Sequence, residues 1–170
     1  MSDSSDLMAS DINVRSTGWF IAQTRGRCWS CRKFTPLVAV ALPPTHETLE
    51  TNDVEDGGTE EAWEPADGNA LLFHIEHLPA ASQSRLRRKA PAFRRGQSHS
   101  DTDLYWRNHC EHCDAAQDDE DLFCEPEGAF TPVTPEAASA INLQAVSEPF
   151  EALARGYQYD PEFFEYMPRG

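Results

Sequence analysis

Short apolar runs alternate with polar segments along the chain, and the first two runs predict a β-hairpin over residues 18–42. Residues 19–22 are aromatic and aliphatic, and residues 35–42 are rich in small and β-branched side chains, which is typical of strands. Cys28 and Cys31 lie between the two runs, so we expect them at the turn.

A third apolar run, residues 70–78, alternates apolar with polar side chains and favours a strand that ends at Pro79. Residues 80–89 then consist of good helix formers. Proline is tolerated in a first helical turn, and a residue that precedes a proline disfavours helix. We therefore expect a short helix that stops before Pro91.

A second hairpin is expected over residues 103–124, with Cys110 and Cys113 at its turn and residues 121–124 as its outgoing strand. Its incoming strand begins near Leu104.

The C-terminal part contains two helix-start signals and one alternating run. Thr134 followed by Pro135 is the signature of a capped helix, and residues 160–167 repeat it, which predicts a short C-terminal helix. Residues 141–146 alternate and predict an edge strand. The pattern of residues 148–159 is ambiguous.

Two segments lack an apolar pattern. Residues 1–15 are rich in Ser and Asp and predict a disordered arm that precedes a single domain, residues 16–170. Residues 43–69 hold nine acids within 21 residues, in a stretch without Lys or Arg. We expect a solvated, mobile acidic loop there, which Trp63 attaches to the core.

The net charge sharpens this picture. The 170 residues include 29 acids and 14 bases, which gives −15, and 39% are hydrophobic. Such a charge disfavours non-specific binding to nucleic acid or anionic membrane and favours partners with basic surfaces. No apolar run approaches the ~18 residues of a membrane span, and the acidic N-terminus lacks the features of a signal peptide. We therefore expect a cytoplasmic protein.

Six of the 14 bases fall in a basic segment, residues 79–95, which contains the predicted helix: Arg85, Arg87, Arg88, Lys89, Arg94 and Arg95. Two interpretations stay open. The segment could contact nucleic acid, or it could lie against the acidic loop, and the net charge favours the second.

Two Cys-x-x-Cys pairs, Cys28 with Cys31 and Cys110 with Cys113, are the strongest chemical signal. Five cysteines in a reducing compartment favour metal or free thiols over disulfides. Zinc prefers four tetrahedral ligands, so two tight turns with two sulfurs each predict one structural Zn²⁺. Thioredoxin-like redox pairs are the main rival, but such a pair usually begins a helix. The 78 residues between Cys31 and Cys110 mean that the metal would close a long loop.

Four bases flank the first pair and are expected to offset the thiolate charge and to donate hydrogen bonds to the sulfurs: Arg25, Arg27, Arg32 and Lys33. His109, His112 and Cys124 are spare, because four cysteines already fill a tetrahedron. We expect His112 to point outward or to bond locally, and Cys124 to be a small buried residue.

Three strings surround the cysteines: Cys28-Trp-x-Cys with Thr35-Pro-Leu-Val-Ala, Tyr105-Trp-x-Asn-His-Cys-Glu-His-Cys, and Glu125-Pro-x-Gly-Ala-Phe. They resemble a family of uncharacterised bacterial proteins with a split zinc ribbon. The resemblance covers residues 18–168 and implies a zinc site and a bacterial origin, but no activity. In that pattern a glycine follows each pair, where this chain has Arg32 and Asp114, and Asp tolerates a left-handed turn better than Arg. The expected fold is α+β, with a zinc-ribbon-like β-hairpin core of two zinc knuckles and short peripheral helices.

We expect no enzymatic activity. Four thiolates leave zinc no open position, and the sequence lacks H-E-x-x-H, G-x-S-x-G, P-loop and G-x-G-x-x-G motifs. His74, Glu76 and His77 suggest a metal face, but on a strand His77 lies on the side opposite the other two.

The features favour a non-enzymatic, zinc-stabilised module or adaptor for protein–protein interaction. The alternative is a nucleic-acid-binding zinc ribbon that uses the basic segment. A redox or metal sensor, in which oxidised cysteines release zinc, is a second alternative.

Overall fold

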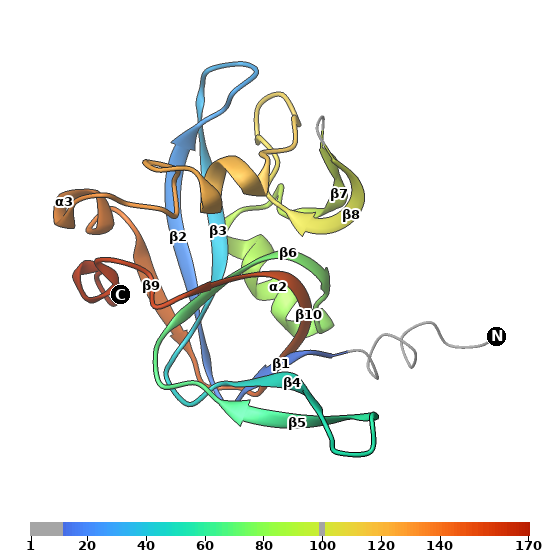
Figure 1. The fold of residues 1–170 in the computed structure, drawn as a ribbon. Helices are drawn as coiled ribbons and strands as arrows, with labels where there is room; N and C mark the ends of the chain where they lie inside the picture. Colours follow the sequence, from blue (N-terminus) through green and yellow to red (C-terminus); the bar gives the residue numbers. More distant parts are fainter. Residues whose placement is uncertain (1–11, 99–100) are drawn as a thin grey trace.

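The computed structural model describes residues 12–98 and 101–170, which are organised around an antiparallel β-sheet of ten strands (Figure 1). The strands are β1 (Val14–Ser16), β2 (Trp19–Arg27), β3 (Phe34–Leu42), β4 (Glu47–Asp53), β5 (Thr59–Pro65), β6 (Ala70–His77), β7 (Arg94–Ser98), β8 (Asp101–Arg107), β9 (Asn142–Val146) and β10 (Phe150–Tyr159). Their order in the sheet is β5-β4-β1-β10-β6-β3-β2-β9, and the β7–β8 hairpin joins through β8 to β6. The helices are short: α2 (Ala80–Lys89), α3 (Pro135–Ala138), the π-helix η1 (Glu120–Cys124) and the 3-10 turn η2 (Phe164–Tyr166).

The central strand β3 is buried on both faces, which explains its nearly continuous apolar run. Val38 and Val40 belong to a hydrophobic cluster that includes Leu86 of α2. Leu37, on the opposite face, belongs to a second cluster that includes Phe123 of η1. Helix α2 thus covers one face, and the segments that carry η1, α3 and η2 cover the other. Among the described residues, no helix is long and apolar enough to cross a membrane.

Several predicted elements are confirmed. The hairpin over residues 18–42 is formed by β2 and β3, residues 70–78 contain β6, and α2 spans the predicted helix, residues 80–89. Strand β9 lies at the edge of the sheet. Thr134 caps α3, because its Oγ1 accepts the N–H of Ala137 at 3.1 Å. The ambiguous residues 148–159 contain β10.

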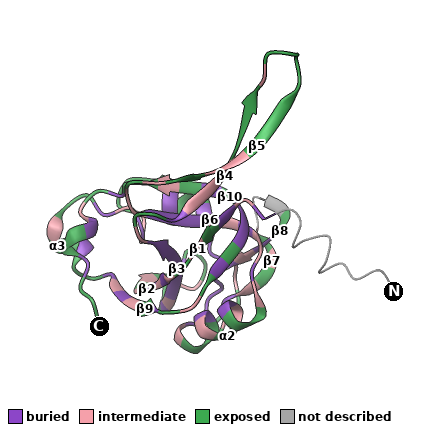
Figure 2. Cartoon of the chain, turned by 90° about the horizontal axis from the view of Figure 1, so that it is seen from below, coloured by how far each residue is buried: buried purple, intermediate pink, exposed green. Residues whose placement is uncertain are grey.

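The predicted acidic loop, residues 43–69, is instead the β4–β5 hairpin, which extends from the body and is exposed along most of its length (Figure 2). The strands form although they are acidic, because cross-strand partners share one face and no acid stands opposite another acid. Glu50 pairs with Ala62, Glu61 with Thr51, and each remaining acid of the ladder also faces a neutral residue.

Trp63 contacts the sheet through Arg15 of β1, but it is half-buried and belongs to neither hydrophobic cluster, so the predicted attachment to the core is not found. The Arg15 guanidinium lies 4.1 Å from the centre of the Trp63 ring and 2.8 Å from a Glu47 carboxylate oxygen. Strand β1 pairs with β4 at the same place.

The prediction of a disordered arm over residues 1–15 extends too far toward the C-terminus. Residues 1–11 lie outside the described residues, but Ile12 and Val14 are buried and β1 pairs with β10 and β4. The alternation Ile-Asn-Val-Arg-Ser is a short strand signal that the polar composition hides.

The predicted zinc-ribbon core and second hairpin are also corrected. The core is the ten-stranded sheet, and both cysteine turns lie at one end of it. Residues 120–124 form η1 rather than an outgoing strand, because Leu122 and Phe123 bury themselves against the sheet in helical geometry. The C-terminal helix is reduced to the single turn η2, which follows Phe163 at φ 62°.

Candidate metal centre

The first cysteine pair lies at the turn of the β2–β3 hairpin. The N–H of Cys28 donates to the Lys33 carbonyl at 2.8 Å, and the N–H of Arg32 donates to the Cys28 carbonyl at 3.0 Å. The N–H of Ser30 donates to Cys28 Sγ at 3.3 Å. Arg32 has φ 69°, in the left-handed region that favours glycine. The turn is therefore tight enough for both sulfurs to face one point.

The second pair repeats this turn on different supports, between β8 and η1. The N–H of Cys110 donates to Ala115 at 2.9 Å, that of Asp114 to the Cys110 carbonyl at 2.9 Å, and that of His112 to Cys110 Sγ at 3.3 Å. Asp114 has φ 68° and so occupies the position of Arg32 in the first turn. A short antiparallel bridge between His109 and Ala116 continues this turn, and the N–H of Gln117 donates to the Asn108 carbonyl at 2.8 Å.

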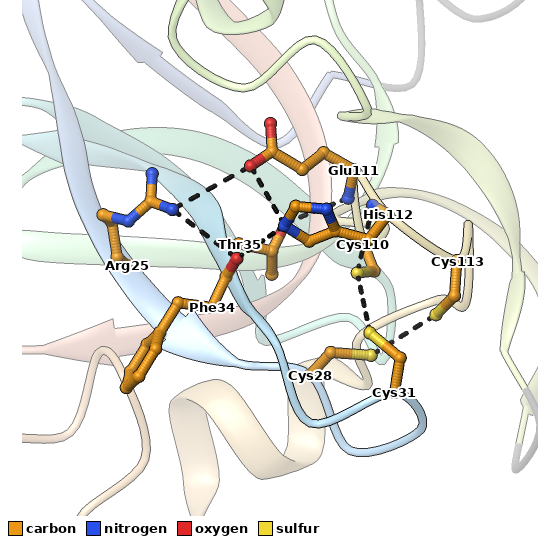
Figure 3. Close-up of polar contacts among 9 residues, drawn as sticks. All are labelled: Arg25, Cys28, Cys31, Phe34, Thr35, Cys110, Glu111, His112 and Cys113. Carbon is orange, nitrogen blue, oxygen red and sulfur yellow. Dashed lines mark hydrogen bonds and ion pairs between the residues drawn. The ribbon is translucent and has the colours of Figure 1, made fainter.

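The fold brings all four predicted ligands together (Figure 3). Cys28 Sγ lies 3.6 Å from Cys113 Sγ, and Cys31 Sγ lies 3.6 Å from Cys110 Sγ. All four sulfurs lie within 4.8 Å of one another. A tetrahedron with metal–sulfur bonds of about 2.3 Å has edges of about 3.8 Å. The cluster therefore has the size and the donor set to hold a metal ion.

Crowding of the thiols perturbs their acidity. Burial opposes ionisation of Cys28, but N–H groups of Cys31 and Ser30 and the Gln117 amide outweigh it and lower its pKa to about 6. A backbone bond at Lys33 favours ionised Cys31, but desolvation and the neighbouring thiols raise its pKa to about 11. Thiols this close cannot all ionise unless a cation offsets their charge, so the arrangement suits a metal cation.

Hydrogen bonds outside the cysteines also join the two turns. The Asn108 side chain bonds both backbone groups of Val38, accepting its N–H at 2.9 Å and donating to its carbonyl at 3.0 Å. The N–H of Glu111 donates to Thr35 Oγ1 at 3.0 Å. Both Asn108 and Thr35 are buried, so these bonds hold the second turn against β3.

Two further contacts connect the turns at the surface. Trp29 Nε1 donates to the carbonyl oxygen of Ala116 at 2.8 Å. His112 is exposed, as expected, but its Nε2 lies 3.0 Å from the Phe34 carbonyl, so it contacts the first turn rather than a local partner. The two turns are thus held together partly without a metal.

The sequence did not predict a role for Gln117, whose side-chain amide donates a hydrogen bond to a cysteine sulfur. Its Nε2 lies 3.3 Å from Cys28 Sγ and 2.9 Å from the Ala115 carbonyl. The predicted arginine donors are not found in this role among the described residues: Arg27 donates to the Arg32 carbonyl at 3.0 Å, and Arg25 reaches the Phe34 carbonyl. Nothing local marks Gln117 in the sequence except its position seven residues after Cys110.

The spare residues lie outside the cluster. His109 is buried, its Nδ1 lies 3.2 Å from the carbonyls of Ala92 and Arg107, and burial lowers its pKa. Cys124 is exposed at the end of η1, so its predicted burial is wrong. Partial desolvation and the Glu120 carboxylate raise the pKa of its thiol to about 11, which keeps it protonated and unreactive.

The His74, Glu76 and His77 run does not form a metal face. Glu76 pairs with Arg155, and the His74 ring stacks on Tyr105 with centroids 4.7 Å apart. Outside the cysteines, no group of three or more potential ligands converges among the side chains of residues 12–98 and 103–170.

The bases of the basic segment differ in their contacts: some form ion pairs and others do not. Arg85 pairs with Glu148, and Arg94, which belongs to β7, pairs with Asp114 at 2.7 Å. Arg95, also on β7, is exposed.

The remaining three bases, Arg87, Arg88 and Lys89, form the last turn of α2 and make no ion pair with any described residue. The interpretation that the basic helix lies against the acidic segment is wrong, because α2 and the β4–β5 hairpin lie on opposite sides of the body (Figure 2). The two segments pack on different strands of the sheet.

Comparisons with family models, curated proteins and solved structures find no match for this chain.

Proposed function

We propose that the four cysteines bind one structural zinc ion and that the chain is a zinc-stabilised adaptor for a protein partner in the bacterial cytoplasm. Zinc is favoured because four thiolates in a tetrahedral arrangement suit zinc or an iron–sulfur centre, and turns of this kind with two sulfurs each are typical of zinc. The metal would join the β2–β3 hairpin to the segment after β8.

The metal is assigned a structural role because the site is closed. Four protein sulfurs complete a tetrahedron and leave no position for water or substrate. Backbone N–H groups and the Gln117 amide already donate hydrogen bonds to two of the four sulfurs, those of Cys28 and Cys110. The function therefore belongs to the surfaces that the zinc supports rather than to the metal.

The observation that carries the adaptor role is the projecting acidic β4–β5 hairpin (Figure 2). An isolated two-stranded ribbon is marginal in water, and six acids on its strands repel one another. Three acids lie on each face, because paired residues share a face: Glu47, Asp53 and Glu61 on one, Glu50, Glu60 and Glu64 on the other. Such an arm suits a partner with a basic groove that can contact both faces.

The hairpin is also oriented by the body. Arg15 holds its base through Glu47 and Trp63, and β1 pairs with β4. A charged arm held at one end presents its acids in a defined direction, which increases the rate of association with a basic surface.

The test is capture of partners from a nuclease-treated bacterial lysate, with bound proteins identified by mass spectrometry. A variant with Glu50→Gln, Glu60→Gln and Glu61→Gln removes three hairpin charges. Its matched control, Glu136→Gln, Glu162→Gln and Glu165→Gln, removes three exposed charges elsewhere. We expect a basic partner that the control retains and the hairpin variant loses. Equal capture by both variants, or capture that nuclease abolishes, contradicts the adaptor role of the hairpin.

A further inference from the structure

One face of the β2–β3 hairpin continues past the end of helix α2. Arg25 pairs with Pro36 and Arg27 with Phe34, and paired residues share a face. Gln23 pairs with Val38 on the same face, and Val38 packs in the cluster that contains Leu86 of α2. The helix therefore covers the part of this face around Val38. The part nearer to the first cysteine turn, around Arg25 and Phe34, is uncovered.

A groove of about 520 Å³ lies where the uncovered face meets the C-terminal end of α2 and the start of β9. Two cations line it, Arg25 from β2 and Lys89 from α2. Three neutral side chains that can hydrogen-bond also line it, Gln23, Thr24 and Asn142, and no described acid does. In a chain of net charge −15, a groove with this lining is an unusual local environment.

The cations of this groove are available. Lys89 makes no ion pair with a described residue, and the same holds for Arg87 and Arg88 in the same helical turn. Arg25 lies 3.9 Å from Glu111, but the two side chains are 59% and 37% exposed, and such a long, solvent-screened pair contributes little. The other bases of the segment that form ion pairs, Arg85 and Arg94, do not line the groove.

The acidic hairpin does not cancel this positive charge. It lies on the side of the body opposite α2, the helix that contributes Lys89 to the groove (Figure 2). At physiological ionic strength charges are screened beyond about 8 Å. A phosphate at the groove therefore responds mainly to the nearby charges: Arg25, Lys89 and the Glu111 carboxylate that lies 3.9 Å from Arg25.

An exposed aromatic ring extends the same face. Phe34 is 51% exposed, and the Arg27 guanidinium lies 4.7 Å from the centre of its ring. Figure 3 shows the Phe34 ring on the side away from the cysteine cluster, and the Arg25 guanidinium directed at Glu111 and the Phe34 carbonyl. A cationic groove beside an exposed aromatic ring is the combination that binds single-stranded nucleic acid, because phosphates contact the cations and a base stacks on the ring.

We propose that this groove binds single-stranded nucleic acid, with Arg25 and Lys89 on successive phosphates and Phe34 under an unpaired base. Gln23, Thr24 and Asn142 supply amide and hydroxyl groups to sugar and base edges.

The test is fluorescence anisotropy with 5′-labelled oligo(U) and oligo(dT) of twenty nucleotides and the zinc-loaded full chain, over a range of salt concentrations. In the double variant Arg25→Gln, Lys89→Gln, the slope of log affinity against log salt should fall by about 1.4, because each single-strand phosphate contact contributes about 0.7. Arg95→Gln is the control, since it removes an exposed cation from β7, outside the groove, and should lower the slope by less than about 0.3.

A second variant distinguishes binding of nucleic acid from binding of any other polyanion. Phe34→Ala should weaken oligonucleotide binding by about five-fold or more at constant slope, while heparin binding is unchanged. Thermal melts of every variant verify that it is folded. The proposal is overturned if neither oligonucleotide binds at low salt, if Arg95→Gln acts like the double variant, or if Phe34→Ala changes nothing.

Discussion

Removal of the proposed metal link should destabilise the protein by an amount that follows from its position in the chain. The cysteine pair Cys31 and Cys110, whose sulfurs are 3.6 Å apart, is separated by 79 positions. For a cross-link that closes a loop of about 80 residues, the chain-entropy relation gives about 4.5 kcal/mol at 25 °C. With an unfolding entropy of about 2.1 cal/mol/K per residue, this corresponds to a decrease in Tm of roughly 13 °C for 170 residues.

The variant for this test is Cys110→Ser, Cys113→Ser, which leaves ligands on one turn only, so no metal can join the two segments. Differential scanning calorimetry of the zinc-loaded wild type, the chelator-treated wild type and the variant gives the three values of Tm. We expect the last two to agree with each other and to lie roughly 13 °C below the first.

Cys124→Ser is the matched control, because Cys124 is exposed and lies outside the cluster. Its Tm should equal that of the zinc-loaded wild type. The reasoning is refuted if the double variant melts within about 2 °C of the wild type, or if Cys124→Ser loses as much as the double variant.

Three further substitutions test other parts of the account. Gln117→Ala removes the amide that donates to Cys28 Sγ and should weaken metal affinity about ten-fold in a chelator competition. Burial raises the pKa of Asp119 to about 6, above the ~3.9 of an unfolded aspartate, so the folded state binds more protons between these values. The free energy of unfolding should therefore fall as pH rises from about 4 to 6, and Asp119→Asn should flatten this dependence in urea titrations. Gly128→Ala would place a Cβ against the Asp121 carbonyl and should cost about 1–3 kcal/mol in the same titrations.

Each of these has a control on this chain. Gln144→Ala removes a half-buried glutamine on the edge strand β9 and should leave metal affinity unchanged. Glu120→Gln removes the exposed acid next to Asp119 and should leave the pH dependence intact. Gly18→Ala adds a methyl group at ordinary contact distance and should cost less than Gly128→Ala. If a control has the same effect as its partner, the physical reason given for that substitution is wrong.

The four-cysteine cluster could be predicted from sequence because a Cys-x-x-Cys turn is a local structure. Its hydrogen bonds run within six residues, from Cys28 to Lys33 and from Cys110 to Ala115. The partners of those turns could not be predicted, since Gln117 and Asn108 act on Cys28 and Val38 across about 70 to 90 positions of sequence.

Elements whose structure follows from their own sequence were predicted correctly. Elements that depend on pairing with a distant strand were missed. Strand β6 and helix α2 were predicted from local signals, an apolar run that ends at Pro79 and a following run of good helix formers. Strand β1, by contrast, exists because β10 and β4 lie on either side of it. The β4–β5 hairpin depends on a register that sets each acid opposite a neutral residue, and composition alone predicts a loop for such a segment.

Metal content, measured by elemental analysis of the full chain purified without added metal, tests the central claim most directly. The account predicts about one zinc per chain in the wild type and in Cys124→Ser, and none in Cys110→Ser, Cys113→Ser. A wild-type chain without zinc, or a double variant that retains it, would contradict the assignment of these four cysteines to one structural site.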